Sequence, residues 1–367
     1  MYKQYLKTTF KIIIFLISLI IIINLFVDPG KIYLKKIVTE KKANDYIKEL
    51  LNSKDGLVRD GWNERLIKTT LAKETGNFEC AILGSSHIMQ ISSIRKIGNI
   101  QNQCSNLLNL GVSGGSLEDV FVFSYFIFKN NKLPKKVFID IAPWTLKFNM
   151  DSRYGAYMNE YIKMNELLEI KYKSETISYK EKVFKNLINW EYFYYSMQTL
   201  KDKKAKAFDY FKKKIIEPEK PYKYSEGYEK SIILPDGAHI YNSSYITKQL
   251  KNNSNIPIGG GDYKINGEEY SELAVNNLIK LLKLYQSSSV KVSFILTPYH
   301  PNVFKNGKTK SVQYMEVVNK VITEIAQKYN IKIYGSFFPE ELGCKESEYL
   351  DFMHPTTECL RKIDFRY

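Results

Sequence analysis

The sequence predicts an α/β protein with a parallel sheet of five strands, an N-terminal transmembrane helix and a large helical insertion. Three observations support this prediction. From residue 80 onward, short apolar runs alternate with longer stretches at helical spacing. A long aliphatic run stands near the N-terminus. Residues 145 to about 265 separate the third and fourth predicted strands, which is far more chain than one crossover helix needs.

Composition places the chain of 367 residues among globular proteins, since 44% of its residues are hydrophobic. The formal net charge is +15, but the lysines are scattered along the chain instead of forming one basic helix. There is no zinc-finger spacing, so we expect no nucleic-acid partner. Four histidines without close ligand spacing predict no metal site, and no cofactor is expected.

The N-terminal run, residues 12–27, reads IIIFLISLIIIINLFV. As a helix it is about 24 Å long, slightly shorter than a hydrocarbon core, and Lys11 before it can snorkel. Lys3 and Lys7 favour a cytoplasmic N-terminus. The segment after the run, residues 28–30, lacks the small residues of a signal-peptidase site. We therefore expect a single-pass anchor in membrane lipid with the body outside the cytoplasm; a buried core helix is the alternative.

The predicted strands share apolar, Val- and Ile-rich runs that suit a buried parallel sheet, and they lie at residues 80–84, 106–112, 136–142, 290–297 and 331–335. Helices are expected between them, at residues 116–130, 268–285 and 312–329. This alternation favours right-handed crossovers.

The insertion, residues 145–265, has helical stretches such as residues 181–200 and two turn-rich loops, 233–241 and 259–263. Residues 31–78 are predicted to be a polar, helical juxtamembrane region. The predicted domains are the anchor (1–30), the juxtamembrane region (31–78) and an α/β domain that contains the insertion (79–367).

The four cysteines suit an exported protein. Cys80 opens the first strand and Cys104 precedes the second, so the two can pair if these strands are parallel neighbours. Cys344 and Cys359 bracket a polar motif near the C-terminus. Two disulfides are one hypothesis, and four buried reduced thiols are the other.

Polar or glycine-rich segments follow four of the predicted strands. They are GSSH (84–87), GVSGG (111–115), APW (142–144) and TPYHP (297–301). Because ligands bind beyond the carboxyl ends of parallel strands, these segments are expected to converge on one binding edge.

Near the C-terminus, the sequence YLDFMHPTT places Asp351 three residues before His354. A carboxylate near one imidazole nitrogen leaves the other nitrogen free to accept a proton, which is what a serine nucleophile needs. The alternative is that Asp351 caps a terminal helix and His354 is an ordinary loop residue.

The order GSS (84–86), NLGVSGG (109–115) and DFMH (351–354) resembles the SGNH, or GDSL-like, hydrolase superfamily. The resemblance covers about residues 78–145 and 288–360. It implies a flavodoxin-like three-layer α/β/α sandwich. It also implies that Ser86 is the nucleophile, that the Ser86 and Gly114 amides form the oxyanion hole, and that Asp351 and His354 complete the triad. In this resemblance Ser85 replaces the usual Asp and has a structural role.

One block departs from the superfamily pattern. The usual Gly-x-Asn-Asp after the third strand is replaced by DIAPWT (140–145), which lacks the Asn that supplies an oxyanion donor. This resembles the membrane-anchored branch of D-alanyl-lipoteichoic acid transfer and alginate O-acetylation proteins, whose partners are multipass membrane-bound O-acyltransferases. His87, Trp144 or a backbone amide can replace the missing donor. His300 and His239 are lone histidines in predicted loops; the alternative is that His300 lines the pocket and that His239 covers it from the insertion.

The resemblance and the anchor together predict a serine O-acyltransferase that modifies a cell-surface polysaccharide through an acyl-serine intermediate. Its substrates would be an acyl donor and a glycan. A carbohydrate esterase that removes acetyl groups is one alternative. A catalytically inactive envelope scaffold of the same fold is the other, and the missing Asn is the feature that favours it.

Overall fold

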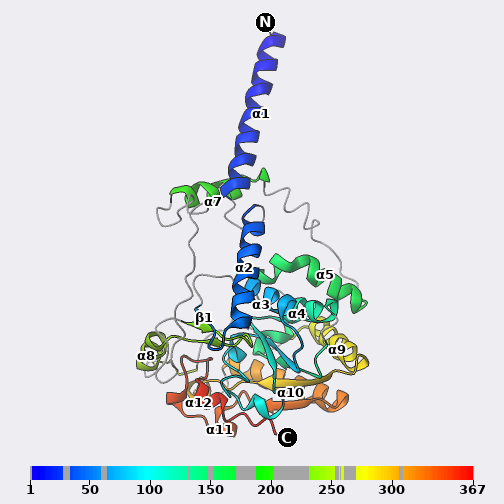
Figure 1. The fold of residues 1–367 in the computed structure, drawn as a ribbon, viewed down its shortest axis with the longest axis vertical. Coiled ribbons are helices and arrows are strands. Elements are labelled where there is room, and N and C mark those ends of the chain that lie inside the picture. The colour runs from blue at the N-terminus through cyan, green and yellow to red at the C-terminus, as the bar shows by residue number, and fades with distance from the viewer. Residues whose placement is uncertain are drawn as a thin grey trace. The chain divides into compact units, whose positions relative to one another are not determined.

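The computed structural model describes residues 2–27, 34–58, 64–130, 133–147, 152–170, 187–201, 231–252, 256, 258–259, 270–305 and 309–366 (Figure 1). The chain divides into two compact units. The first unit is Met1–Asp45 with Tyr172–Pro218, and the second is Tyr46–Lys171 with Glu219–Tyr367. The predicted boundaries at residues 30 and 78 stay a prediction.

The first unit contains α1 (Tyr2–Val27), the start of α2 (Leu34–Asn52) and α7 (Trp190–Lys201). By length and composition, α1 can cross a membrane, and a signal sequence near the N-terminus would pass the same test. Most of its apolar side chains are exposed. Part of the predicted helical stretch 181–200 lies outside the described residues.

The second unit is built on a five-stranded sheet in which every neighbouring pair is parallel. Its strands, in the spatial order β3-β2-β4-β7-β8, are β2 (Cys80–Gly84), β3 (Leu107–Gly111), β4 (Lys136–Asp140), β7 (Lys291–Leu296) and β8 (Lys332–Gly335). The predicted α/β class and all five predicted strands are therefore confirmed.

The predicted crossover helices are confirmed as α4 (Leu117–Lys129), α9 (Glu272–Ser287) and α10 (Lys310–Tyr329). Each begins at a side-chain cap of the expected type. Ser116 and Asp119 form a capping box on α4, and Ser271 and Thr309 accept backbone N–H groups of α9 and α10. α4 contacts β2, α9 contacts β7 and α10 contacts β8.

Among the described residues, the buried cluster on one face of the sheet contains no residue of a long helix. Ile82, Phe138 and Ile295 project from three strands into a buried cluster on this face. The segments that cover them are short and irregular, and they come from residues 88–100, 232–240 and 360–365. β2 and β3 are buried at every position, and because successive side chains point to opposite faces, both faces of the sheet are apolar.

The insertion contributes to a small antiparallel sheet beside the edge strand β3. This sheet has the order β1-β5-β6 and consists of β1 (Leu57–Val58), β5 (Ile232–Ile233) and β6 (His239–Ile240). The turn before β6 meets β3 directly, because the Asn109 N–H donates to the Asp236 carbonyl at 2.6 Å. Gly237 has φ +86°, and a Cβ there would lie 2.3 Å from the Asn109 oxygen. The turn-rich loop 233–241 therefore covers an edge strand.

The remaining helices of the second unit are shorter: α3 (Glu64–Glu74), α5 (Met158–Leu167), α8 (Ser243–Asn252), α11 (Pro339–Leu342) and α12 (Thr357–Leu360). Both hypothesised disulfides are formed, Cys80–Cys104 and Cys344–Cys359. Of the second predicted loop, 259–263, only Gly259 lies within the described residues.

Candidate active site

The three predicted catalytic residues meet at the carboxyl edge of the sheet. Ser86 follows β2 and begins a 3₁₀ turn, and its Oγ lies 2.8 Å from Nε2 of His354. Nδ1 of the same ring lies 2.8 Å from Oδ2 of Asp351. Ser86 is half-buried, and the side chains of His354 and Asp351 are 21% and 31% exposed. The three groups therefore form a continuous hydrogen-bonded chain that solvent can reach.

Asp351 is held in place by its own loop. Its Oδ1 accepts the backbone N–H groups of Met353 and His354 at 2.8 and 2.9 Å. Burial raises the pKa of Asp351, but the bond to His354, its charge and the two backbone N–H groups outweigh burial, so the pKa lies below its ordinary value. An ionised carboxylate at this position orients the imidazole and stabilises its protonated form.

Asn109 fixes the turn that follows Ser86. This side chain is fully buried in β3, and its Nδ2 donates to the carbonyls of Ile88 and Ile91, both at 2.8 Å. Its Oδ1 accepts the N–H of Gly111 at 2.9 Å. The Asn109 side chain thus connects the loop after β2 to the start of the loop after β3. Sequence reasoning missed this role, although an Asn within an otherwise apolar strand is a signal for it.

The glycine turn after β3 lies against residues 84–87, which carry the predicted nucleophile Ser86 and are called the nucleophile loop. Val112 N–H donates to the Gly84 carbonyl at 3.1 Å. A Cβ on Gly115 would lie 2.2 Å from that same oxygen and 3.0 Å from Cα of Ser85. Gly114 has φ +59°, a conformation that favours glycine. Among the described residues, no group accepts a hydrogen bond from the backbone N–H of Ser86 or Gly114, so both predicted oxyanion donors are available.

Helix α3 holds this glycine turn from the other side. Glu64 accepts the backbone N–H and hydroxyl of Ser113 at 2.7 and 2.9 Å. Arg65 makes two 2.7 Å bonds to the carboxylate of Asp119, and both side chains are buried. The predicted juxtamembrane region thus supplies residues that position the site. Sequence patterns did not indicate this, because charged helical residues are usually solvated.

Ser85 is bonded to a buried carboxylate at the end of β4. Its N–H and hydroxyl donate to Oδ2 of Asp140 at 2.9 and 2.6 Å. Burial raises the pKa of Asp140 to about 6, although the two bonds from Ser85 oppose that rise. In the described part of the chain, Oδ1 of Asp140 has no hydrogen-bond partner. Asp140 was not singled out from the sequence, and it fixes the residue that precedes Ser86, the predicted nucleophile.

The raised pKa of Asp140 predicts a loss of stability as pH rises. Its folded-state pKa of about 6 lies above the ordinary 3.8, so the folded protein binds a proton that the unfolded chain releases between those values. This pKa difference corresponds to about 3 kcal/mol of unfolding free energy, which is present below pH 4 and lost by pH 7. We expect the difference in unfolding free energy, Asp140→Asn minus wild type, to increase by up to this amount between pH 4 and pH 7. Only the wild type loses the stability that is linked to the Asp140 proton. Urea unfolding at both pH values measures it, and a constant difference would contradict the assignment.

His87 is buried against three aromatic rings. It is 2% exposed, and ring centroids of Trp144, Tyr299 and His354 lie 5.3, 5.3 and 5.5 Å from its own. Within the described residues, neither of its ring nitrogens has a hydrogen-bond partner. Burial and the nearby His354 lower the pKa of His87 to about 3. His87 is therefore neutral at physiological pH and carries one N–H beside the triad.

Two of the other predicted pocket residues, Trp144 and His300, make hydrogen bonds within the protein. Trp144 is buried, and its Nε1 donates to the Gly115 carbonyl at 2.9 Å, so its N–H already has an acceptor. His300 accepts the Asn302 N–H through Nδ1 at 3.0 Å, and burial lowers its pKa. The His300 backbone N–H donates to the Phe352 carbonyl within the Asp351–His354 loop.

His239 lies in β6, where the insertion passes beside the nucleophile loop. Its backbone N–H donates to the Met89 carbonyl at 2.8 Å, and its ring lies 4.8 Å from that of Tyr241. The insertion therefore reaches the turn that follows Ser86. A role for His239 as a cover over the site stays a prediction.

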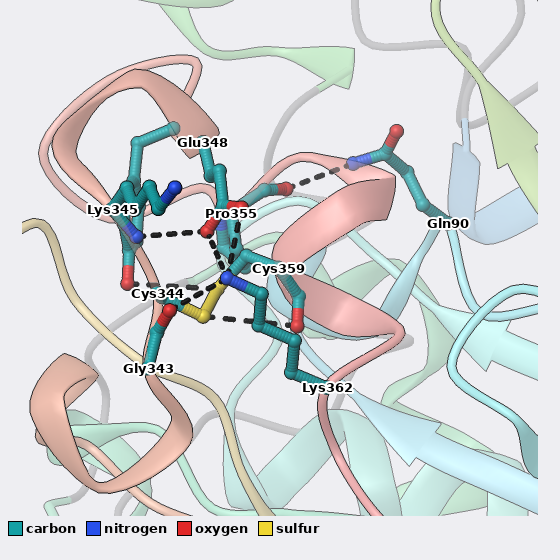
Figure 2. The surroundings of a disulfide bond; sticks show 9 residues. Gln90, Gly343, Cys344, Lys345, Glu348, Pro355, Cys359 and Lys362 are labelled. Atoms are coloured by element: carbon teal, nitrogen blue, oxygen red, sulfur yellow. Dashed lines mark hydrogen bonds and ion pairs between the residues drawn. A yellow bond between two sulfur atoms is a disulfide. The ribbon is translucent and has the colours of Figure 1, made fainter.

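A disulfide closes the loop that carries Asp351 and His354. Figure 2 shows the bond between Cys344 and Cys359 with its neighbours. Lys362 reaches both oxygens of Glu348 at 2.8 and 2.7 Å beside it. Gln90, shortly after the nucleophile, donates to the Pro355 carbonyl at 3.2 Å (Figure 2). The loop is thus cross-linked at its base and tied to the segment that carries Ser86.

No protein-family model matches this chain, and no curated protein matches its sequence.

Proposed function

We propose that this chain is a membrane-anchored, extracytoplasmic SGNH-like serine O-acyltransferase that modifies a cell-surface polysaccharide. The observation that carries the proposal is the chain of 2.8 Å contacts from Ser86 through His354 to Asp351. These side chains are partly exposed, and they come from segments far apart in sequence. A serine with a positioned base and an oriented imidazole is the arrangement that nucleophilic acyl transfer requires.

Three further features support the proposal. Numbered by their order in the chain, the five parallel strands lie side by side as 2-1-3-4-5, the order of flavodoxin-like folds. Both disulfides favour an oxidising compartment, and α1 can hold the body at a membrane. The residues after β4, which lack the Asn of most SGNH enzymes, favour the membrane-anchored branch of that superfamily.

The proposed reaction has two acyl-transfer steps. Ser86 Oγ attacks the carbonyl carbon of an ester donor while His354 Nε2 accepts the serine proton. The tetrahedral intermediate expels the donor alcohol, which takes that proton and leaves an acyl-serine. A sugar hydroxyl then attacks this ester, gives its proton to His354 and departs as the acylated sugar, and the proton returns to Ser86. The negative oxygen of each intermediate is bound by the Ser86 and Gly114 amides.

We assign the missing oxyanion donor to His87. Its imidazole is neutral, it is buried beside the triad, and no described residue accepts its N–H. A buried donor without a partner costs about 1–3 kcal/mol in the free protein, and a substrate oxygen would remove that cost. Trp144 is the weaker candidate, because its N–H already binds the Gly115 carbonyl.

Replacing His87 by Leu is expected to lower kcat by about 10²-fold, because one oxyanion donor is lost from the transition state. Covalent labelling of Ser86 by a fluorophosphonate should remain detectable. His87→Asn, which restores an N–H donor, should recover part of the rate. Stopped assays of acyl release at saturating donor measure the effect, and equal kcat for wild type and His87→Leu would exclude the assignment.

The proposal is tested by separating transfer from hydrolysis. Full-length protein in lipid vesicles is supplied with an acetyl ester donor and an unmodified glycan, and acetylated glycan is quantified by mass spectrometry. Transfer that requires Ser86 supports the acyltransferase. Hydrolysis without transfer would favour the carbohydrate esterase, and neither reaction would favour an inactive scaffold. We also propose a multipass membrane-bound O-acyltransferase as the partner that supplies the acyl group, so the assay is repeated with envelope membranes.

A further inference from the structure

We propose that helix α7 lies in the headgroup region of a lipid bilayer and forms, with α1, a two-helix membrane-docking unit. This inference rests on the proposed membrane-spanning role of α1. Both helices belong to the same compact unit of the chain, and they contact one another directly. One buried amide in α1 and one apolar face of α7 support this inference.

The buried amide is Asn24, three residues before α1 ends at Val27. Asn24 is fully buried, although most of the preceding apolar side chains of α1 are exposed. Its Nδ2 donates to the Leu187 carbonyl at 2.9 Å, and its Oδ1 accepts the hydroxyl of Ser196 at 2.9 Å. A fully buried amide is costly without hydrogen-bond partners, so the bonds to Ser196 in α7 and to Leu187 just before it tie α7 to the end of the apolar helix.

The apolar face of α7 consists of Trp190, Phe193, Met197 and Leu200. Their spacing of three, four and three residues places them on one side of a helix. Ser196, which is bonded to α1, lies about 80° around the helix from the middle of this face. The side chains of Trp190 and Leu200 are 70% and 42% exposed, and Phe193 and Met197 are partly exposed, so the described residues cover this face only in part.

Lipid fits this face better than a protein groove does. The exposed apolar side chains of α1 extend to Phe26, two residues beyond the Asn24 that binds Ser196 of α7, so α7 lies next to a surface that already suits lipid. Tryptophan at one end of the face, next to Phe193 at 5.2 Å between centroids, is typical of the membrane interface. Lys201 in the last turn suits contact with anionic headgroups. A covalently attached surface helix would hold the second unit at the membrane.

The test uses single cysteines labelled with an environment-sensitive fluorophore. All four native cysteines are in disulfides, so an introduced cysteine is the one free thiol. Trp190→Cys and Leu200→Cys report on the apolar face, and Gln198→Cys is the matched control on the same helix. Leu19→Cys reports on the middle of α1. The full-length protein is reconstituted in phosphatidylcholine–phosphatidylglycerol vesicles that carry nitroxide lipids labelled near the headgroup or deep in the acyl chain.

We expect the shallow nitroxide to quench the probes at positions 190 and 200 at least about twofold more than the probe at 198. The deep nitroxide should quench the probe at 19 most strongly. Equal, weak quenching at 190, 200 and 198 with strong quenching at 19 would overturn the docking of α7 alone, and would assign the face to a partner protein. Weak quenching at 19 would overturn the membrane span itself. Retained catalytic activity in either case would leave the proposed acyl-transfer chemistry standing, whereas weak quenching at 19 would remove the proposed membrane anchor.

Discussion

Ser86→Ala is expected to abolish covalent labelling by a fluorophosphonate and to lower acyl release by at least about 10³-fold. The physical reason is that Ser86 carries the only hydroxyl that the structure places 2.8 Å from the free nitrogen of His354, among the residues it describes. Without that oxygen no acyl-serine can form, and the remaining oxyanion donors act only on a water attack. Gel fluorescence after labelling and a donor-hydrolysis assay measure both effects.

The neighbouring serine supplies a matched control. Ser85→Ala removes a hydroxyl that is bonded to Asp140 and leaves the Ser86–His354 contact in place. Labelling should therefore persist in Ser85→Ala, with a loss of stability of about 1–3 kcal/mol because a buried carboxylate loses a donor. Unchanged labelling in Ser86→Ala would assign the nucleophile to another residue and contradict the proposed triad. Loss of labelling in Ser85→Ala alone would do the same.

Gly115→Ala is expected to lower both stability and activity. The added Cβ would lie 2.2 and 2.7 Å from the carbonyl oxygen and carbon of Gly84, and 3.0 Å from Cα of Ser85. These are backbone atoms of the nucleophile loop, so the contact cannot be relieved by turning a side chain. Overpacking of this kind costs about 1–3 kcal/mol, and a displacement of about 1 Å in the site costs about 10² in rate.

Thermal unfolding and kcat/KM of Gly115→Ala, measured beside Gly76→Ala, test this prediction. A methyl group added at Gly76 would meet no atom within 4 Å, and the backbone there is one that any residue adopts, so this substitution should be close to neutral. The two variants add the same single methyl group to the chain. If both variants have the same unfolding temperature and kcat/KM, the close contact between the loops after β2 and β3 does not contribute to stability or activity.

The sequence by itself determined the local elements of this protein. Each predicted strand of the parallel sheet is present with its bounds shifted by no more than a few residues, and α4, α9 and α10 follow the predicted helices. These features are encoded by periodicity and by caps, which depend on neighbours along the chain. Ser86, Asp351 and His354 were predicted from the resemblance that GSS (84–86) and DFMH (351–354) carry, and the structure brings these three side chains into contact.

Only the tertiary structure decided which polar groups are buried together. Nothing in the chain near Asn109 predicts its bonds to Ile88 and Ile91, and nothing near Ser85 predicts Asp140. The same holds for Asn24 and Ser196. An Asn within an apolar strand signals a buried polar group, but the local sequence does not identify the partner of that group. Its partner is chosen by strand order and loop packing across long separations, and those arise when the apolar surfaces of distant segments are brought together.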